Sequence, residues 1–309
     1  MKSVRAFAPA TVANVACGFD IFGFALDSPG DEVVASKKEG QGVHFKAIHG
    51  NSALSIDPAK NTASVAVAAM LSELKQDVAI ELELFKKMPL ASGLGSSAAS
   101  AAAALLAVNR LLGEPFTRRQ LVPFAMEAER MACKVAHADN VAPSLIGGFV
   151  LVRSYNPLDL VSVSVPSELH CALLHPAIEV RTDDARKVIK TSIPLPLAVA
   201  NWGNAAGLIA GLLTNDFALI GRSLEDAIFE PDRALLVPGF DAIKQAALKS
   251  GALGSSLSGS GPSLFALCDS KERAHGVAKA MRIACEGVGM QGQTYVSSIN
   301  RRGAVIQES

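Results

Sequence analysis

The chain contains 309 residues, of which half are hydrophobic, and its 29 Lys and Arg residues balance its 29 Asp and Glu residues. A chain of this length can bury one large core or two moderate ones, and we expect two domains. The zero net charge excludes a basic surface field of the kind that attracts nucleic acid or an anionic membrane, so we expect neither as a partner.

Residues 1–20 lack the long apolar run of a signal peptide, and we expect no segment long enough to span a membrane. The five cysteines are odd in number and form no C-x-x-C pair, which argues against a disulfide framework and against a zinc site. These features predict a soluble cytoplasmic protein whose cysteines are reduced.

In the first half of the chain, hydrophobic periodicity predicts helices and strands in mixed order. The expected helices cover residues 62–76, 96–112 and 118–136, and the expected strands cover residues 80–85, 148–153 and 161–165. The third helix is predicted to begin at a capping box formed by Thr117 and Gln120 and to be kinked by Pro123.

Proline, serine and asparagine gather at residues 154–167, and this composition places a domain boundary near residue 165. We therefore expect domains at residues 1–165 and 166–309. In the second domain the pattern predicts strands at residues 169–174, 264–268 and 293–299 and helices at residues 183–190, 195–213, 240–249 and 270–286. Strands and helices do not alternate strictly, which favours an α+β fold over a doubly wound sheet.

The segment Pro-Leu-Ala-Ser-Gly-Leu-Gly-Ser-Ser-Ala-Ala at residues 89–99 is the most informative motif. Gly93 and Gly95 allow positive φ and a close approach of the backbone to a bulky anion. The following helix offers unpaired N–H groups and the positive end of its dipole, and Ser96 and Ser97 add hydroxyls. A tight turn before an alanine-rich helix would fit a lone glycine pair, but eleven such residues in a row favour a phosphate-binding loop.

This loop differs from the common phosphate-binding motifs. The sequence contains no Gly-Lys-Ser or Gly-Lys-Thr and neither His-Arg-Asp nor Asp-Phe-Gly, which excludes a Walker-type loop and a protein kinase. A second glycine-rich segment lies at residues 254–263. Alone it fits a turn between strands, whereas together with the first loop it is better interpreted as a second loop over the same ligand.

Three clusters of polar residues complete the pattern. Asn14 and Asp20 lie among small apolar residues near the N-terminus, and Glu129 precedes the segment His-Ala-Asp-Asn-Val-Ala-Pro at residues 137–143. The second half of the chain adds a threonine and two arginines: Thr182, Arg186 and Arg233. Taken singly, each of these residues also fits a structural role, such as a helix cap, a core histidine or a solvated surface charge.

The order of these motifs resembles that of the GHMP small-molecule kinases, named for galactose, homoserine, mevalonate and phosphomevalonate. The matching segments are residues 9–20, 89–99 and 258–262, and the resemblance extends from residue 4 to about residue 268. The His-x-Asp-Asn segment at residues 137–140 resembles the homoserine kinases in particular. The resemblance implies a domain like the second domain of ribosomal protein S5, then a ferredoxin-like domain, with the active site in the cleft between them.

The resemblance also implies ATP and Mg²⁺ as cofactors. The phosphates of ATP would be held by residues of the first loop: Pro89, Ala91, Ser92, Gly93, Leu94, Gly95, Ser96, Ser97 and Ala98. Ser97 and Glu129 would position the magnesium ion. Asn61 would belong to the adenine pocket, and the second loop would border the nucleotide at four residues: Ser258, Gly259, Ser260 and Gly261.

The implied reaction is phosphorylation of the L-homoserine hydroxyl to O-phospho-L-homoserine, a step of threonine biosynthesis. Arg186 and Arg233 would bind the substrate carboxylate. Asp20 would bind the ammonium group, with three polar residues nearby: Asn14, His137 and Thr182. Asn140 would lie close to the hydroxyl and form the catalytic set together with Glu129 and Ser97.

Asn140 stands where mevalonate kinase and its relatives have an aspartate that is proposed as a base. An amide is a poor proton acceptor, and phosphoryl transfer through a loose transition state needs little deprotonation of the nucleophile. We therefore expect Asn140 to orient the hydroxyl, and we assign no general base. Two alternatives stay open: a related kinase of another small alcohol, and a non-catalytic regulator that binds a nucleotide or metabolite. The resemblance also implies a homodimer.

Overall fold

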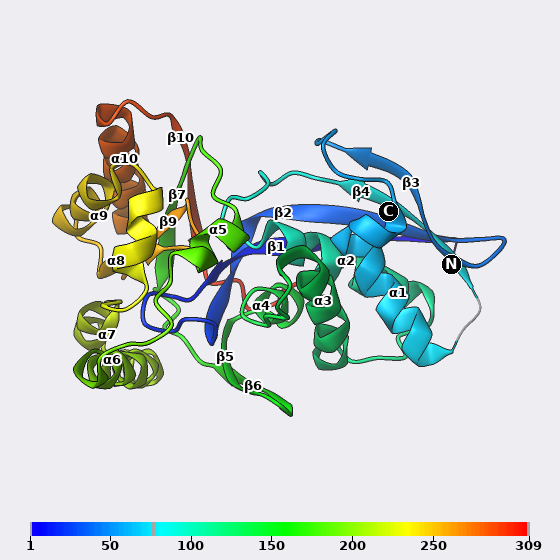
Figure 1. Ribbon diagram of the computed structural model, residues 1–309, viewed down its shortest axis with the longest axis horizontal. Helices are drawn as coiled ribbons and strands as arrows, with labels where there is room; N and C mark the ends of the chain where they lie inside the picture. The colour runs from blue at the N-terminus through cyan, green and yellow to red at the C-terminus, as the bar shows by residue number, and fades with distance from the viewer. Residues whose placement is uncertain (1, 76–77, 308–309) are drawn as a thin grey trace.

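The computed structural model describes residues 2–75 and 78–307. The chain forms a seven-stranded sheet in the order β11-β1-β2-β4-β3, with β5 beside β2 and β6 beside β5, and a four-stranded sheet in the order β10-β7-β9-β8. Strands and helices do not follow the regular alternation of a doubly wound fold (Figure 1). The predicted α+β class is confirmed.

The seven-stranded sheet is built mainly from the first half of the chain. Its strands are β1 (Ser3–Ala13), β2 (Phe22–Lys38), β3 (Gly42–His49), β4 (Ala79–Phe85), β5 (Phe149–Tyr155), β6 (Leu158–Val163) and β11 (Val305–Gln307). Neighbouring strands are antiparallel except for the parallel pair β3 and β4. In β4, Ile80, Leu82 and Leu84 are buried while Glu81 and Glu83 are half-buried, so one face of the strand lies against the core.

Four helices lie together on one side of this sheet (Figure 1). They are α1 (Thr62–Leu74), α2 (Ser96–Leu111), α3 (Arg118–Cys133) and α4 (Val141–Ile146), and the short 3-10 helix η1 (Pro58–Lys60) precedes α1. Helices α2 and α4 contact β1 and β2, and α1 and α3 pack on α2.

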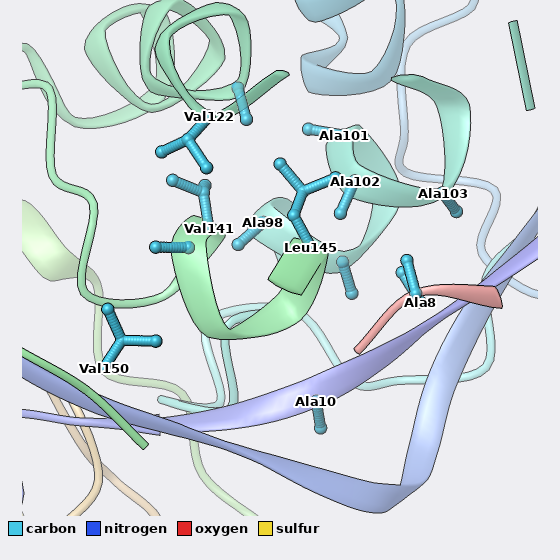
Figure 2. Close-up of a cluster of buried hydrophobic side chains, with 14 of the residues drawn as sticks. Ala8, Ala10, Ala98, Ala101, Ala102, Ala103, Val122, Val141, Leu145 and Val150 are labelled. Atoms are coloured by element: carbon cyan, nitrogen blue, oxygen red, sulfur yellow. The ribbon is translucent and has the colours of Figure 1, made fainter. Parts of the chain in front are cut away.

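Helix α2 is rich in alanine because it lies in the middle of this core. Ala98 and Ala102 are fully buried, and their small side chains let the helix approach its neighbours closely. Figure 2 shows these residues near Ala8 and Ala10 of β1 and Leu145 of α4. This packing anchors α2, and it therefore fixes the position of the glycine-rich loop that leads into the helix.

The four-stranded sheet comes from the second half of the chain. Its strands are β7 (His170–Pro176), β8 (Gly254–Leu257), β9 (Leu264–Cys268) and β10 (Gly292–Ser298), and all neighbouring pairs are antiparallel. The helices of this half are α5 (Thr182–Lys187), α6 (Leu195–Thr214), α7 (Phe217–Ser223), α8 (Glu230–Arg233), η2 (Ala234–Leu236), α9 (Phe240–Lys249) and α10 (Lys271–Gly287). Helices α9 and α10 pack on the sheet and on each other.

The chain passes from the first sheet to the second between β6 and β7, close to residue 165, and returns at its end. Strand β11 pairs with β1, Asn300 N–H donates to Ala25 O, and Leu26 forms an isolated bridge with Ile299. The two sheets also share one core, in which the rings of Phe24 and Phe265 meet edge to face at 6.2 Å. The domain division at residue 165 stays a prediction.

Most expected elements are present within a few residues of their predicted ends. The capping box is confirmed, because the Thr117 side chain accepts from Gln120 N–H while the Gln120 side chain accepts from Thr117 N–H. Pro123 lies inside α3 without ending it. The predicted end of the first helix, Gln76, lies outside the described residues. The structure adds elements that the pattern did not predict: β1, β2, β3, β8, β11, α4, α7 and α8.

The expectation that no segment is long enough to span a membrane is wrong. Helix α6 has 20 residues and is apolar enough to meet the length and composition of a membrane span. Length and composition alone do not separate such a helix from a core helix of a soluble protein. In α6, Leu208 and Leu212 are buried, and the amides of Asn201 and Asn204 donate to Cys17 O and Glu225 O. One face of α6 is therefore used for packing within the protein.

Candidate active site

A cleft of 310 Å³ lies between the glycine-rich loop, the segment 129–140 and the helices α5 and α8. It is lined by every residue that was predicted to bind the amino-acid substrate or to act in catalysis. From the predicted nucleotide set, the cleft is lined by Asn61, Ala91, Ser92, Gly93, Gly95, Ser96, Ser97, Gly259 and Ser260. The remaining predicted nucleotide residues lie outside its lining: Pro89, Leu94, Ala98, Ser258 and Gly261.

The glycine-rich loop uses left-handed backbone at two positions. Gly93 has φ +75° and Gly95, the N-cap of α2, has φ +64°. A Cβ on Gly93 would lie 2.4 Å from Ser258 O, and one on Gly95 would lie 2.1 Å from Thr11 Oγ1, so both positions require glycine. Among the described residues no side chain caps α2, which leaves N–H groups of its first turn available to an anion.

The second glycine-rich loop supports the first one from behind. Ser258 Oγ donates to Gly93 O at 2.7 Å, and Ser263 Oγ donates to Ser92 O at 2.6 Å. Leu94 and Ala98, which are fully buried, anchor the other side of the first loop in the core. Some residues of the two loops therefore lie behind the lining of the cleft and hold its backbone in place.

Ser97 and Glu129 meet across the cleft, because α3 runs beside the start of α2. Ser97 Oγ donates to Glu129 Oε1 at 2.6 Å. Glu129 is 7% exposed, and burial raises the pKa of its carboxyl while the bond from Ser97 acts in the opposite direction. A carboxylate in this position gains strongly from a nearby cation.

Asp20 lies at the end of the cleft that the two arginines occupy. Arg186 donates to Asp20 Oδ1 at 2.8 Å, and His137 Nδ1 lies 3.6 Å from the same oxygen. Arg233 is 4% exposed, and burial lowers the pKa of its guanidinium to about 10 while the negative charge of Asp20 acts in the opposite direction. Burial also lowers the pKa of His137, which favours its neutral form, while the charge of Asp20 acts in the opposite direction.

Four polar atoms of the cleft are buried and lack a hydrogen-bond partner in the part of the chain that the structure describes. They are Ser96 Oγ, His137 Nε2, Asp139 Oδ1 and Arg186 Nε, which we call the open atoms. Buried polar groups are nearly always paired in folded proteins, and leaving one unpaired costs about 1–3 kcal/mol. The open atoms therefore indicate that a polar ligand completes the cleft.

Asp139 was part of the motif at residues 137–140, but the sequence assigned it no role. Its side chain faces the cleft at 4% exposure. Burial, reinforced by the charges of Asp20 and Glu129, raises the pKa of Asp139 to about 8. Its carboxyl is therefore mostly protonated at pH 7, and a positive group placed beside it would favour the carboxylate form.

Asn140 lies beside the glycine-rich loop and is held by a residue that sequence reasoning missed. Thr11, which is fully buried in β1, donates from Oγ1 to Asn140 Oδ1 at 2.7 Å. The N–H donors of Asn140 Nδ2 are then the polar groups that this side chain offers to the cleft. Thr11 lies inside the motif at residues 9–20, but the sequence does not reveal its contact with Asn140, because that contact joins residues 129 positions apart.

The other predicted polar residues hold the walls of the cleft. Asn14 Oδ1 accepts from Asp20 N–H, and Asn14 Nδ2 donates to Gly259 O. Asn61 caps α1 by accepting from Ala63 N–H. Thr182 Oγ1 lies 3.4 Å from Ser260 Oγ. These contacts join both halves of the chain around the cleft.

A buried lysine below the loop was also missed by the sequence. Lys86 follows β4, and its Nζ forms an ion pair with Asp31 and donates to Ser96 O at 2.6 Å and to Ser100 Oγ at 2.8 Å. Burial lowers the pKa of Lys86, and the charge of Asp31 acts against this effect. The cluster ties β2 and the end of β4 to the first turn of α2.

Comparison with known families defines the class of protein. The family model for the GHMP kinases N terminal domain matches residues 61–148, and the model for the GHMP kinases C terminal matches residues 208–287. The first region contains the glycine-rich loop, Glu129 and Asn140, and the second region covers most of the second half of the chain. A mevalonate kinase of L. major, solved with R-mevalonate, has the same fold, with a TM-score of 0.71 at 17% identity over 95% of each chain.

Relatives with higher sequence identity identify the family within this class of kinases. The homoserine kinase of Chlorobium phaeovibrioides is 53% identical over 99% of this chain and all of the relative, and that of Chloroherpeton thalassium is 51% identical with the same coverage. A crystal structure of homoserine kinase from Cytophaga hutchinsonii has 52% identity and a TM-score of 0.97, covering 99% of this chain and 98% of that one. The chain therefore belongs to the homoserine kinase family of the GHMP kinases.

Proposed function

We propose that this chain is an ATP-dependent kinase that phosphorylates the hydroxyl of L-homoserine to O-phospho-L-homoserine, in threonine biosynthesis. The observation that carries the proposal is the set of open atoms in a cleft that also contains an uncapped helix N-terminus. Acceptor and donor groups lie at one end of the cleft and an anion-binding loop lies beside them. This arrangement suits an amino acid next to a chain of phosphates.

The glycine-rich loop would hold the phosphates of ATP. Its backbone comes close to the cleft at Gly93 and Gly95, and Ser96 Oγ is an open atom at the first turn of α2. Asn61 would lie toward the adenine, and Gly259 and Ser260 would border the nucleotide from the opposite wall. The predicted residues behind the loop would act by fixing its backbone.

Ser97 and Glu129 are the residues that would hold Mg²⁺. Magnesium prefers oxygen ligands and is usually bound by one or two protein groups together with substrate phosphates and waters. A hydroxyl and a carboxylate oxygen 2.6 Å apart, beside the phosphate-binding loop, fit this preference. When bound, the ion would neutralise charge on the phosphates, and it would favour the ionised form of Glu129, which burial disfavours.

The two ends of the zwitterionic substrate would meet opposite charges. Arg186 and Arg233 would bind its carboxylate, and the open Nε of Arg186 is a donor available for this purpose. Asp20 already accepts from Arg186, so we add Asp139, whose Oδ1 is open, as a second acceptor for the ammonium group. Asn14, His137 and Thr182 would complete this end of the cleft.

Asn140 would orient the hydroxyl toward the γ-phosphate. Thr11 holds Oδ1, so the amide N–H groups would donate to the hydroxyl oxygen and leave its lone pair directed at phosphorus. A loose transition state for phosphoryl transfer needs positioning and charge neutralisation more than early removal of the proton. The catalytic set of Asn140, Glu129 and Ser97 would supply these two effects without a general base.

A panel of small alcohols tests the function. Purified protein is incubated with ATP, Mg²⁺ and L-homoserine, mevalonate or galactose, and ADP release is followed by a coupled assay. Homoserine should be turned over with the highest kcat/KM. Faster turnover of mevalonate or galactose would refute the homoserine assignment, and tight ATP binding without turnover of any alcohol would favour a non-catalytic regulator.

We also propose that two copies pair through the outer face of α6, which lies at the outside of the molecule (Figure 1). Leu195, Val199, Trp202 and Leu213 are between 54% and 67% exposed on this helix, and their spacing follows one helical stripe. The helix contains no charged residue, so the stripe can meet its own copy around a twofold axis without like charges in contact. Light scattering should give a dimer for the wild type and a monomer for Trp202→Lys; an unchanged dimer would exclude this face.

We further propose a cytoplasmic location. The supporting observation is that Cys17, Cys171, Cys268 and Cys285 are buried free thiols, which persist in a reducing compartment where ATP is abundant. Fractionation of cells that express the tagged protein tests this proposal.

A further inference from the structure

Phe19 lies directly before Asp20 and contacts both arginines of the cleft. The Cζ atom of Arg233 lies 4.8 Å from the centroid of the Phe19 ring, and that of Arg186 lies 5.4 Å from it. Both distances are within the range of about 6 Å in which a guanidinium is attracted to an aromatic ring. The ring of Phe229 is stacked on Phe19, with centroids 3.9 Å apart and an interplanar angle of 22°.

The hydrogen bonds of the two guanidinium groups use only some of their N–H donors. Arg186 donates to one carboxylate oxygen of Asp20, and its Nε is an open atom. Arg233 donates to two backbone carbonyls, Ala185 O at 3.4 Å and Gly259 O at 3.2 Å. The two guanidinium groups also carry like charges, which repel each other. A neutral aromatic surface against both groups offsets this repulsion without occupying their donors.

The chain takes an unusual path to place Phe19 here. Asn14, Val15, Ala16 and Asp20 all have positive φ, between +43° and +68°, a conformation that side-chain-bearing residues rarely adopt. A Cβ on Gly18 would lie 2.0 Å from the ring of Phe22, so this neighbour must be glycine. The strained loop presents the ring of one residue and the carboxylate of the next to the same pair of arginines.

Hydrogen bonds of the backbone also fix the position of Phe229. The carboxylate of Asp226 accepts from the N–H groups of Ile228, Phe229 and Glu230, which sets the turn before α8. Arg233 N–H donates to Phe229 O, so the residue that backs Phe19 and the arginine that lies over Phe19 belong to one short helical turn. The two aromatic rings thus connect the loop 14–20 to α8.

We propose that Phe19, backed by Phe229, is a positioning residue that holds Arg186 and Arg233 side by side as a clamp for a carboxylate. This inference rests on the proposed function, in which the amino acid binds at this end of the cleft. Phe19 is not expected to touch the reacting hydroxyl or the phosphates. Its effect should therefore appear in the affinity for the amino acid and leave the nucleotide and the chemical step unaffected.

The test compares Phe19→Leu, which removes the aromatic face, with Phe19→Tyr, which keeps it. For Phe19→Leu we expect KM for L-homoserine to rise about tenfold, the loss of roughly one desolvated guanidinium–ring contact. KM for ATP and kcat should stay within about twofold, since neither depends on the clamp. Phe19→Tyr should behave like the wild type. Phe116→Leu, which disrupts an edge-to-face ring pair with Phe124 away from the cleft, is the matched control and should change none of these constants.

Several outcomes overturn the inference. If Phe19→Leu leaves KM for homoserine unchanged, the ring only fills space. The same conclusion follows if KM for ATP rises, and kcat falls, by as large a factor as KM for homoserine rises. If Phe19→Leu does not fold, Phe229→Leu leaves Phe19 in place and should raise KM for homoserine with the same selectivity; no rise would contradict the proposal. Failure of the proposed function would appear in the wild type, as absence of phosphoryl transfer to homoserine, and is thus distinguished from failure of the clamp.

Discussion

Replacing Asp139 by asparagine should stabilise the free protein at neutral pH and weaken its binding of homoserine. Burial raises the pKa of Asp139 from 3.8 to about 8. The folded protein therefore keeps this carboxyl protonated at pH values where the unfolded chain ionises it. Because the folded pKa is raised, stability falls as the pH rises from about 4 to about 8, and the loss is complete above that value.

The magnitude follows from the two pKa values. Each pH unit between them is worth about 1.4 kcal/mol, so the penalty at pH 7 is about 4 kcal/mol. Asparagine at position 139 does not ionise, but its buried amide N–H groups would lack acceptors, which costs about 1–2 kcal/mol. The expected net gain for Asp139→Asn at pH 7 is about 2–3 kcal/mol.

Urea unfolding between pH 5 and pH 8, without nucleotide or magnesium, measures this gain. The wild-type free energy of unfolding should fall more steeply with pH than that of Asp139→Asn, and the two curves should meet near about pH 5, where the penalty and the amide cost are equal. The same variant should raise KM for homoserine by more than about tenfold, because a neutral amide cannot form an ion pair with the ammonium group. Equal pH slopes, or a variant less stable than the wild type at pH 7, would refute the reasoning.

Three further predictions concern the chemistry. Glu129→Gln should fold but lose about a hundredfold or more in kcat, since a charge next to the metal and phosphates is removed; a near wild-type rate at limiting Mg²⁺ would contradict this role. Arg186→Lys and Arg233→Lys should each weaken homoserine binding by about 1–3 kcal/mol while KM for ATP stays unchanged, and a loss mainly in ATP affinity would move that arginine to the nucleotide. Asn140→Ala should lower kcat with ATP affinity intact, and Asn140→Asp should also lose activity because a new charge faces the phosphates; a several-fold gain with an acidic limb in the pH profile would show that a base is useful.

Local patterns in the sequence predicted much of the secondary structure. Helix α2 follows Gly95, the capping box opens α3, and β4 alternates buried and half-buried residues, all as expected. These features depend on residues within a few positions of one another, so a short window contains the information. Strand β2 was not predicted, because it is 17 residues long and includes Pro29 and Gly30, which look like turn residues until the strands beside them are known.

The residues of the candidate site were likewise predicted only in part. The glycine-rich loops, Glu129 and the segment 137–140 are visible in the sequence, since their chemistry requires particular residue types at fixed spacing. Asp139 and Phe19 stand inside motifs that the sequence marked, yet neither had an assigned role. What distinguishes them is an open carboxyl oxygen and a ring against two arginines, and both are contacts across the fold.

The sequence by itself determined the class of fold, the phosphate-binding loop and the types of polar residue that gather around it. Only the tertiary structure decided which role each of those residues has in the site. Thr11 holds Asn140 across 129 positions, and Phe19, near the N-terminus, contacts Arg186 of α5 and Arg233 of α8 in the second half of the chain. The pKa of Asp139 and the orientation of the arginines depend on burial and on neighbouring charges. Those quantities exist only after distant segments have packed together and excluded water from the cleft.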